Sequence, residues 1–175
     1  MKIAVTGKMC SGKTTLCNYL CKLEPRFQIF SFGKKVKEVA TDLFKMDPLS
    51  KDRTLLTGIG QKMREIDSEV WSNYVIRQSK DVEFCLIDDL RYQNEYEVLV
   101  KSGFQIIQLN ISDELQEQRI KEVYPNNYKD HLKNRNHLSE LNKFQWQSDH
   151  PHLSIDSSIY PDNIKEIVEE FIGSF

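Results

Sequence analysis

Apolar runs of strand length alternate with amphipathic segments along most of this sequence. Five strands are predicted from these runs, at residues 2–6, 27–32, 84–87, 104–109 and, more briefly, around 153–155. The run 84–87 is apolar at every position, which is typical of a strand covered on both faces by helices. The strand pattern therefore favours a parallel sheet between two helical layers.

Between the strands, apolar residues recur at intervals of three and four, the spacing of one helix face. This spacing predicts helices over 13–23, 33 to about 45, 53–66, around 70–75, around 92–100, 113 to about 123, and from Pro161 to 172. Strands that alternate with helices predict an α/β fold, a doubly wound parallel five-stranded sheet with helices on both faces. Ligands of such folds bind at the carboxyl ends of the strands.

Residues 7–14, GKMCSGKT, join the first predicted strand to the first predicted helix. They have the spacing G-x-x-x-x-G-K-[ST] of a P-loop, in which successive backbone N–H groups turn toward a di- or triphosphate. Lys13 can then reach the outer phosphates, and the Thr14 hydroxyl can bind Mg²⁺. We expect this loop and the start of the helix to bind nucleotide phosphates through Gly7, Lys8, Cys10, Ser11, Gly12, Lys13, Thr14 and Thr15. The alternative is a glycine-containing turn without a ligand.

Length and charge exclude several classes of protein. The chain of 175 residues has the length of one domain, and its formal net charge of −2 argues against general binding to nucleic acid or to a membrane surface. No apolar run approaches the roughly 18 residues of a membrane span, and Met1 leads directly into the first strand rather than a signal sequence. We therefore expect a single domain over 1–175 in the cytoplasm.

Two aspartates and an arginine follow the apolar strand 84–87. Asp88 and Asp89 should meet the P-loop at one edge of the sheet, where a carboxylate can hold Mg²⁺ opposite Thr14. Alternatively, one of them caps the next helix. Arg91 can hold a phosphate through two parallel hydrogen bonds, with Asn94 one helical turn further on; a solvated surface arginine is the other reading. We expect Arg91 to lie on the same side of the sheet as Lys13.

Basic and aromatic residues elsewhere suit a second anion and a nucleobase. Phosphoryl transfer between two anions needs positive charge around both, and the candidates for the acceptor are Lys34, Lys35, Arg64 and Arg91. Phe32, Trp71 and Tyr74 could stack on a base, although core packing explains aromatic residues at helical spacing equally well.

The segment from about 113 to 150 is the candidate lid. Residues 124–150 are polar and poor in core-forming side chains, and basic residues outnumber acidic ones over 119–137. Such a segment suits a lid that excludes water from the γ-phosphate, with Arg119 as its best candidate; a solvated loop is the alternative. The histidines His131, His137, His150 and His152 show no catalytic spacing and are expected to be surface or structural residues. The four cysteines show no metal-binding spacing either.

The stretch DDLRYQNEYEVL, residues 88–99, resembles the D-[VL]-R-[FY]-x-N-E-x-E signature of the deoxynucleoside monophosphate kinases of large DNA phages and viruses. SFGKKVKEV, GIGQKMREIDSEVW and HLSE agree with this family in the same order, so the resemblance spans nearly the whole chain. It implies the fold of P-loop nucleoside monophosphate kinases and Mg²⁺-dependent transfer of the ATP γ-phosphoryl group to a deoxynucleoside monophosphate. Phosphomevalonate and dephospho-coenzyme A kinases are more distant relatives.

The resemblance also assigns roles to particular residues. It implies that Lys13 and Thr14 serve the donor phosphates and Mg²⁺, that Asp89 is the acidic residue and that Arg91 holds the substrate phosphate. Gly60, Arg64 and Trp71 match the monophosphate-binding helices, at about 33–80. For the metal, periodicity favours Asp88 and the resemblance favours Asp89. A homodimer is plausible on the same grounds.

Two other functions remain open at this stage. The acceptor could be phosphomevalonate or dephospho-coenzyme A. The protein could also be a P-loop nucleotide switch that transfers nothing, but the N-K-x-D motif of guanine-specific switches has glutamine at Gln145 in place of the aspartate.

Overall fold

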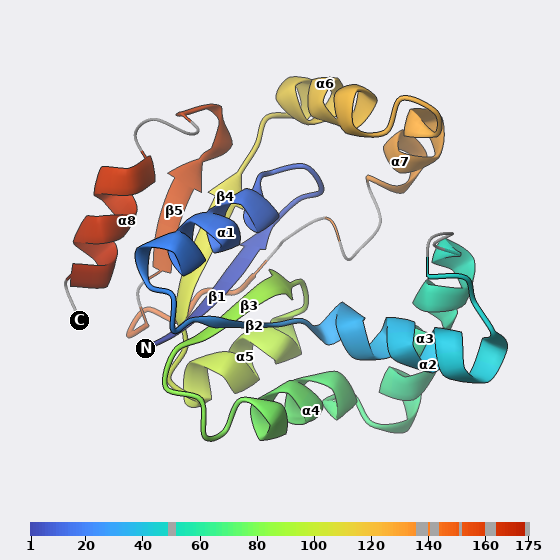
Figure 1. Cartoon of the computed structure of the whole chain (residues 1–175), viewed down its shortest axis with the longest axis horizontal. Helices are drawn as coiled ribbons and strands as arrows, with labels where there is room; N and C mark the ends of the chain where they lie inside the picture. Colours follow the sequence, from blue (N-terminus) through green and yellow to red (C-terminus); the bar gives the residue numbers. More distant parts are fainter. Residues whose placement is uncertain (49–51, 136–139, 141–143, 151, 160–163, 174–175) are drawn as a thin grey trace.

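The computed structural model describes residues 1–48, 52–135, 140, 144–150, 152–159 and 164–173. Its centre is one parallel five-stranded sheet with the strand order β2-β3-β1-β4-β5 (Figure 1). The strands are β1 (Lys2–Gly7), β2 (Gln28–Phe30), β3 (Cys85–Leu90), β4 (Gln105–Asn110) and β5 (His152–Asp156). The predicted fold class is therefore confirmed.

Helices connect successive strands and extend beyond the sheet. They are α1 (Lys13–Leu23), α2 (Phe32–Phe44), α3 (Arg53–Ile66), α4 (Val70–Gln78), α5 (Gln93–Lys101), α6 (Asp113–Val123), α7 (Tyr128–Asn134) and α8 (Ile164–Gly173), with a short 3₁₀ turn at Ser157–Ile159. Helices α2 and α3 project to one side of the sheet in Figure 1, and α6 and α7 lie beyond the end of β4. None of the described helices is long and apolar enough to span a membrane.

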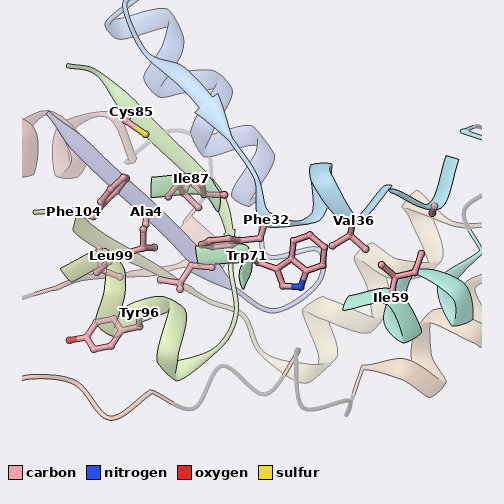
Figure 2. Close-up of a cluster of buried hydrophobic side chains, with 14 of the residues drawn as sticks. Ala4, Phe32, Val36, Ile59, Trp71, Cys85, Ile87, Tyr96, Leu99 and Phe104 are labelled. Atoms are coloured by element: carbon pink, nitrogen blue, oxygen red, sulfur yellow. The ribbon is translucent and has the colours of Figure 1, made fainter. Parts of the chain in front are cut away.

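The two faces of the sheet have separate cores because successive side chains of a strand point to opposite faces. Ile3 and Leu86 pack with Leu16 and Leu20 of α1 and with Val168 of α8. On the other face, the adjacent strand residues pack against α2, α4 and α5, as Figure 2 shows for Ala4, Ile87, Val36, Trp71 and Leu99. Cys17 and Cys85 are buried members of these cores rather than metal ligands.

Two strands differ in length from the prediction. The strand expected over 27–32 ends at Phe30, and Phe32 is the first residue of α2. Conversely, the sequence predicted that the third strand ends at residue 87, but β3 continues through Asp88 and Asp89 to Leu90. The register with β1 shifts between Ala4 and Thr6, which marks an irregularity opposite the two aspartates. Such an irregularity re-aims side chains at the end of a strand.

The stretch 124–150 contains more packed residues than its polar sequence indicates, so the prediction of a segment poor in core contacts is wrong in part. Within it, α7 buries His131, whose ring stacks on Tyr124 at 3.8 Å between centroids. Phe144 and Trp146 pack around the buried Tyr96 of α5. The reason is that a few aromatic residues spaced without periodicity can still anchor an irregular segment.

The remaining histidines that the structure describes have structural contacts, as expected. The His150 ring nitrogen Nε2 lies 2.8 Å from the Phe104 carbonyl oxygen, and His152 stacks on Trp146. His137, the rest of HLSE before Glu140, Asn142 and Lys143 of the imperfect switch motif, and the predicted helix start at Pro161 lie outside the described residues.

Candidate functional site

The P-loop joins the carboxyl end of β1 to α1, as predicted, and two of its residues require glycine. Gly12 has φ 97° at the start of α1. Gly7 has φ 155°, and a Cβ added there would lie 2.4 Å from Ser11 Oγ and 2.8 Å from the Leu109 carbonyl oxygen. Cys10 also has a positive φ, 61°, which is uncommon for a side chain with a Cβ. The loop therefore wraps tightly at the edge of the sheet where β1 ends.

Lys13 folds back over this loop. Its Nζ donates hydrogen bonds to the carbonyl oxygens of Gly7 and Lys8, at 2.6 and 2.9 Å. Burial, and then the nearby charge of Arg91, lower the pKa of Lys13 to about 8. Arg91 lies near this loop, because its ion-pair partner Glu140 also accepts the backbone N–H of Met9 at 2.8 Å. Thr14 and Thr15 are exposed at the first turn of α1.

The two aspartates at the end of β3 have different surroundings. Asp89 accepts hydrogen bonds from Ser31 Oγ at 2.8 Å, from the Phe32 N–H at 2.9 Å and from the Gly33 N–H at 2.8 Å. These donors include the first backbone groups of α2, so Asp89 caps that helix. The sequence offered capping of the next helix along the chain as the alternative to metal binding, but the helix that Asp89 caps is α2, which precedes it in the chain.

Asp88 has a buried oxygen, Oδ1, with no hydrogen-bond partner among the described residues. The carboxylate also lines an open hollow of about 430 Å³ with Ser31, Lys34, Lys37, Glu38, Thr41 and Asp42. A buried carboxylate oxygen without a partner among the described residues fits a divalent cation, and of the two aspartates Asp88 is the better candidate ligand.

Metal binding here would rest on few protein groups. Among the residues that the structure describes, no cluster of three or more His, Cys, Asp or Glu side chains could hold a metal ion. Mg²⁺ in nucleotide sites is held by one or two carboxylates together with substrate phosphates and water, so Asp88 with Thr14 suffices as the protein's share.

Without a cation, the buried charge of Asp88 should destabilise the protein in a pH-dependent way. Burial, and then the adjacent Asp89, raise the pKa of Asp88 from 3.8 to about 6. The unfolded chain thus releases this proton at lower pH than the folded one, and stability is lost as pH rises from about 4 through 6. In EDTA at pH 8, D88N is expected to be more stable than wild type by about 1–2 kcal/mol, after allowance for partial exposure.

Urea unfolding between pH 4 and 8 measures this difference, which should shrink toward pH 4. The exposed Asp149→Asn is the control and should leave the unfolding free energy unchanged. A D88N variant that is less stable than wild type at pH 8 would contradict the orphaned-carboxylate assignment.

Arg91 follows β3 directly and forms an ion pair through Nη1 with the carboxylate of Glu140. Its side chain retains 30% of its exposure, whereas that of Glu140 retains 6%. Arg91 is thus oriented by an ion pair and only partly exposed, whereas the surface-arginine reading expected a solvated side chain.

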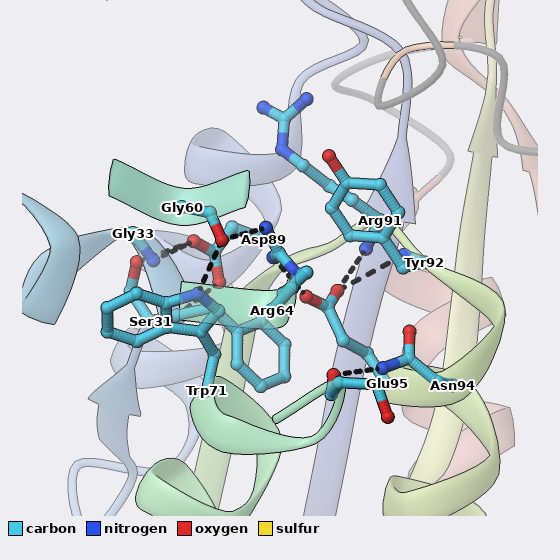
Figure 3. Close-up of polar contacts among 12 residues, drawn as sticks. Ser31, Gly33, Gly60, Arg64, Trp71, Asp89, Arg91, Tyr92, Asn94 and Glu95 are labelled. Carbon is cyan, nitrogen blue, oxygen red and sulfur yellow. Dashed lines mark hydrogen bonds and ion pairs between the residues drawn. The ribbon is translucent and has the colours of Figure 1, made fainter. Parts of the chain in front are cut away.

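Two of the three aromatic residues predicted for the acceptor site are core residues. Phe32 is 4% exposed and Trp71 is 3% exposed, and both belong to the core beneath α2 and α4. The Trp71 Nε1–H donates to the Gly60 carbonyl oxygen at 3.1 Å (Figure 3). Their packing fits the core alternative that the sequence left open. Tyr74 is partly exposed and lies under the Lys35 ammonium, 5.5 Å from its ring centroid.

Arg64 is held next to Arg91 by a buried glutamate (Figure 3). Arg64 Nη2 donates to Glu95 Oε1 at 2.9 Å, and its guanidinium lies over the Tyr92 ring at 4.3 Å. The other Glu95 oxygen accepts the N–H groups of Arg91 and Tyr92 at 3.0 and 3.1 Å. Asn94 donates to the Ser68 carbonyl oxygen at 2.6 Å, a contact with the segment before α4.

Arg119, on α6, contacts the P-loop. Its Nη1 donates to the Cys10 carbonyl oxygen at 3.3 Å and its Nη2 to the Ser157 carbonyl oxygen at 2.8 Å. Ser157 Oγ in turn donates to the Ser11 carbonyl oxygen at 2.8 Å. The residue predicted as a lid arginine thus ties α6 and the turn after β5 to the nucleotide loop.

The sequence pattern gives no role to two residues of this region. Glu95 lies within the signature stretch 88–99, and Glu140 is the last residue of HLSE. Both are acidic residues that are almost fully buried, at 1% and 5% exposure. Their burial could not be predicted from the sequence, because acidic residues are usually exposed. Those that are buried are paired with a cation, here Arg64 and Arg91, and this pairing is visible only in the structure.

Comparisons with known proteins agree with this arrangement. Residues 3–146 match the family model described as AAA domain. A sugar kinase from Janibacter sp. HTCC2649 superposes with a TM-score of 0.65 at 14% identity, covering 98% of this chain and 94% of the other. A protein from Chloroflexus aurantiacus that is assigned as a kinase gives 0.60 at 19% identity, covering 98% and 95%. None of the curated proteins compared with the sequence matches it. At these identities the structural likeness establishes the fold.

Proposed function

The chain belongs to the AAA domain family of P-loop proteins, and from that premise we propose that it transfers the γ-phosphoryl group of ATP to a deoxynucleoside monophosphate. One observation carries the proposal. Arg91, after β3, pairs with Glu140, which also accepts the N–H of Met9 in the P-loop, so Arg91 lies near the loop that carries Lys13, although the two cations are 78 positions apart in the sequence. Two cations at one sheet edge suit two phosphates brought together for transfer.

The donor side consists of the P-loop and α1. Backbone N–H groups of the loop and the positive end of α1 would hold the β- and γ-phosphates, with Lys13 leaving its two carbonyl partners to reach them. Thr14 and Asp88 would hold Mg²⁺, which when bound neutralises developing charge on the phosphates. Arg119 fixes the outer part of the loop through the Cys10 carbonyl group.

On the acceptor side, Arg91, Arg64, Lys34 and Lys35 are the candidate cations. Arg91 and Arg64 are both oriented by buried carboxylates. They would therefore bind the acceptor phosphate without a free-energy cost for reorienting their side chains during the reaction. In the transfer, an oxygen of the acceptor phosphate forms a bond to the γ-phosphorus while the bond to the β-phosphate oxygen breaks. The products are ADP and a deoxynucleoside diphosphate.

The nucleotide class of the acceptor rests on the resemblance of residues 88–99 to the deoxynucleoside monophosphate kinase signature. Phe32 and Trp71 are buried, so they do not stack on a base in this arrangement, and Tyr74 is the remaining candidate among the three. The same resemblance supports a cytoplasmic homodimer, which sedimentation would test. The switch alternative is weakened further because Phe144, inside its imperfect motif, packs against the core.

Incubation with Mg-ATP and a panel of acceptors tests the proposal. The panel contains deoxy- and ribonucleoside monophosphates, phosphomevalonate and dephospho-coenzyme A, and chromatography follows the products. Conversion of a deoxynucleoside monophosphate to its diphosphate is the expected result. Transfer only to phosphomevalonate or dephospho-coenzyme A would change the acceptor, and ATP hydrolysis indifferent to every acceptor would favour a switch.

A further inference from the structure

One carboxylate joins the two halves of the proposed site. Glu140 Oε2 accepts the backbone N–H of Met9, the third residue of the P-loop, at 2.8 Å. Glu140 Oε1 pairs with Arg91 Nη1. A single side chain thus touches the loop that would hold the donor phosphates and the arginine that would hold the acceptor phosphate.

The burial of Glu140 makes this link specific. Its side chain is only 6% exposed, and a buried carboxylate is tolerated where cations and hydrogen-bond donors replace water. Arg91 and the Met9 N–H supply that replacement, and the charge of Glu140 also acts on Lys13. Moving Arg91 away would leave the carboxylate partly uncompensated, so the energetic cost restrains Arg91 to this position.

The backbone of Met9 is held at its carbonyl group as well. Its carbonyl oxygen accepts a hydrogen bond from Nε2 of the buried Gln116 of α6, at 3.1 Å. With both backbone polar groups of Met9 engaged, the first half of the loop is a fixed support. Glu140 therefore ties Arg91 to a rigid part of the donor site rather than to a solvated loop.

We propose that Glu140 is a positioning residue for phosphoryl transfer, which sets the location of the Arg91 guanidinium relative to the P-loop. This inference rests on the proposed function and adds to it a residue that acts through Arg91. It differs from a purely structural ion pair in one respect. A structural pair would matter for stability alone, whereas a positioning residue changes the rate only while Arg91 is present.

A double-mutant cycle on the full chain separates these roles. Glu140→Gln keeps the size of the side chain and an oxygen for the Met9 N–H, but it removes the charge that holds Arg91. With the acceptor that wild type phosphorylates fastest, E140Q is expected to lower kcat/KM for that acceptor about 10- to 100-fold. In an R91A background, under single-turnover conditions, E140Q should add less than about a twofold loss.

Two further variants sharpen the cycle. Glu140→Asp keeps the charge but is one methylene shorter, so its loss should be smaller than that of E140Q; it also replaces E140Q in the cycle if that variant does not fold. Glu83→Gln, an exposed residue just before β3 and at the opposite end of that strand from Arg91, is the matched control and should retain wild-type activity. Circular dichroism melts verify folding of each variant.

The outcomes are distinguishable. Wild-type activity in E140Q, or an equal loss in the wild-type and R91A backgrounds, would overturn the positioning role while leaving the proposed function intact. Absence of transfer by the wild type to every acceptor would overturn the proposed function, and the positioning role with it.

Discussion

Replacement of Lys13 with methionine is expected to reduce phosphoryl transfer about a thousandfold or more, with the fold intact. Lys13 is the cation that the P-loop places closest to the outer phosphates, and methionine keeps the length of the side chain but carries no charge. In the structure its Nζ donates to the backbone carbonyl groups of Gly7 and Lys8, and the side chain belongs to neither core, so its removal spares the sheet and both cores.

Single-turnover assays with labelled ATP measure this effect, and a circular dichroism melt checks folding. Lys22→Met is the matched control, because Lys22 is an exposed lysine on the same helix, near its other end. It should retain full activity. A K13M variant within tenfold of wild type would mean that the P-loop is not the donor site.

Replacement of Arg91 with alanine is expected to reduce transfer by about two to three orders of magnitude. The loss should appear in the acceptor KM as well as in kcat, because Arg91 would contact the acceptor phosphate in both the ground and the transition state. ATP affinity should change much less, since the P-loop contacts remain. This split between the substrates identifies Arg91 as an acceptor-side residue.

R91A should also have a measurable stability cost. It leaves the carboxylate of Glu140 buried beside the Met9 N–H without its principal cation, which destabilises by about 1–3 kcal/mol. Urea unfolding gives this number, and Arg77→Ala, an exposed arginine on α4, is the control for both assays. Wild-type turnover by R91A with every monophosphate would end the acceptor-site assignment.

Local signals predicted the fold and the tightly wrapped loop between β1 and α1 well. The glycines of the P-loop have a fixed spacing, which restricts the loop to a few backbone conformations. The apolar runs of β1, β3 and β4 are buried on both faces of the sheet. The end of β2 was less predictable. Phe32 continues an apolar run in the sequence, but its N–H donates a hydrogen bond to Asp89, 57 residues later, and α2 begins there. A hydrogen bond between residues far apart in the sequence thus outweighs the local strand pattern.

The connections within the acceptor site were not predictable from spacing. Arg91 was identified by its place after a strand, but its partner Glu140 lies in a segment without periodicity, 49 residues further on. Likewise, Asp88 and Asp89 are adjacent residues with the same side chain, so the sequence does not distinguish their roles. Only the contacts of α2 with Asp89, and the orphaned Oδ1 of Asp88, separate their environments.

The central position of β1 in the sheet has a consequence for folding of the chain during its synthesis. Its neighbours in the sheet are β3 and β4, so the strand that leads into the P-loop lacks its first partner until Leu90 has been synthesised and its second until Asn110. At cellular rates of elongation, the first strand waits roughly 5 to 20 seconds after its own synthesis for both neighbours. During that interval the buried strand KIAVTG is an incompletely paired apolar segment. Chaperone capture of nascent chains should therefore be strongest before β4 emerges from the ribosome.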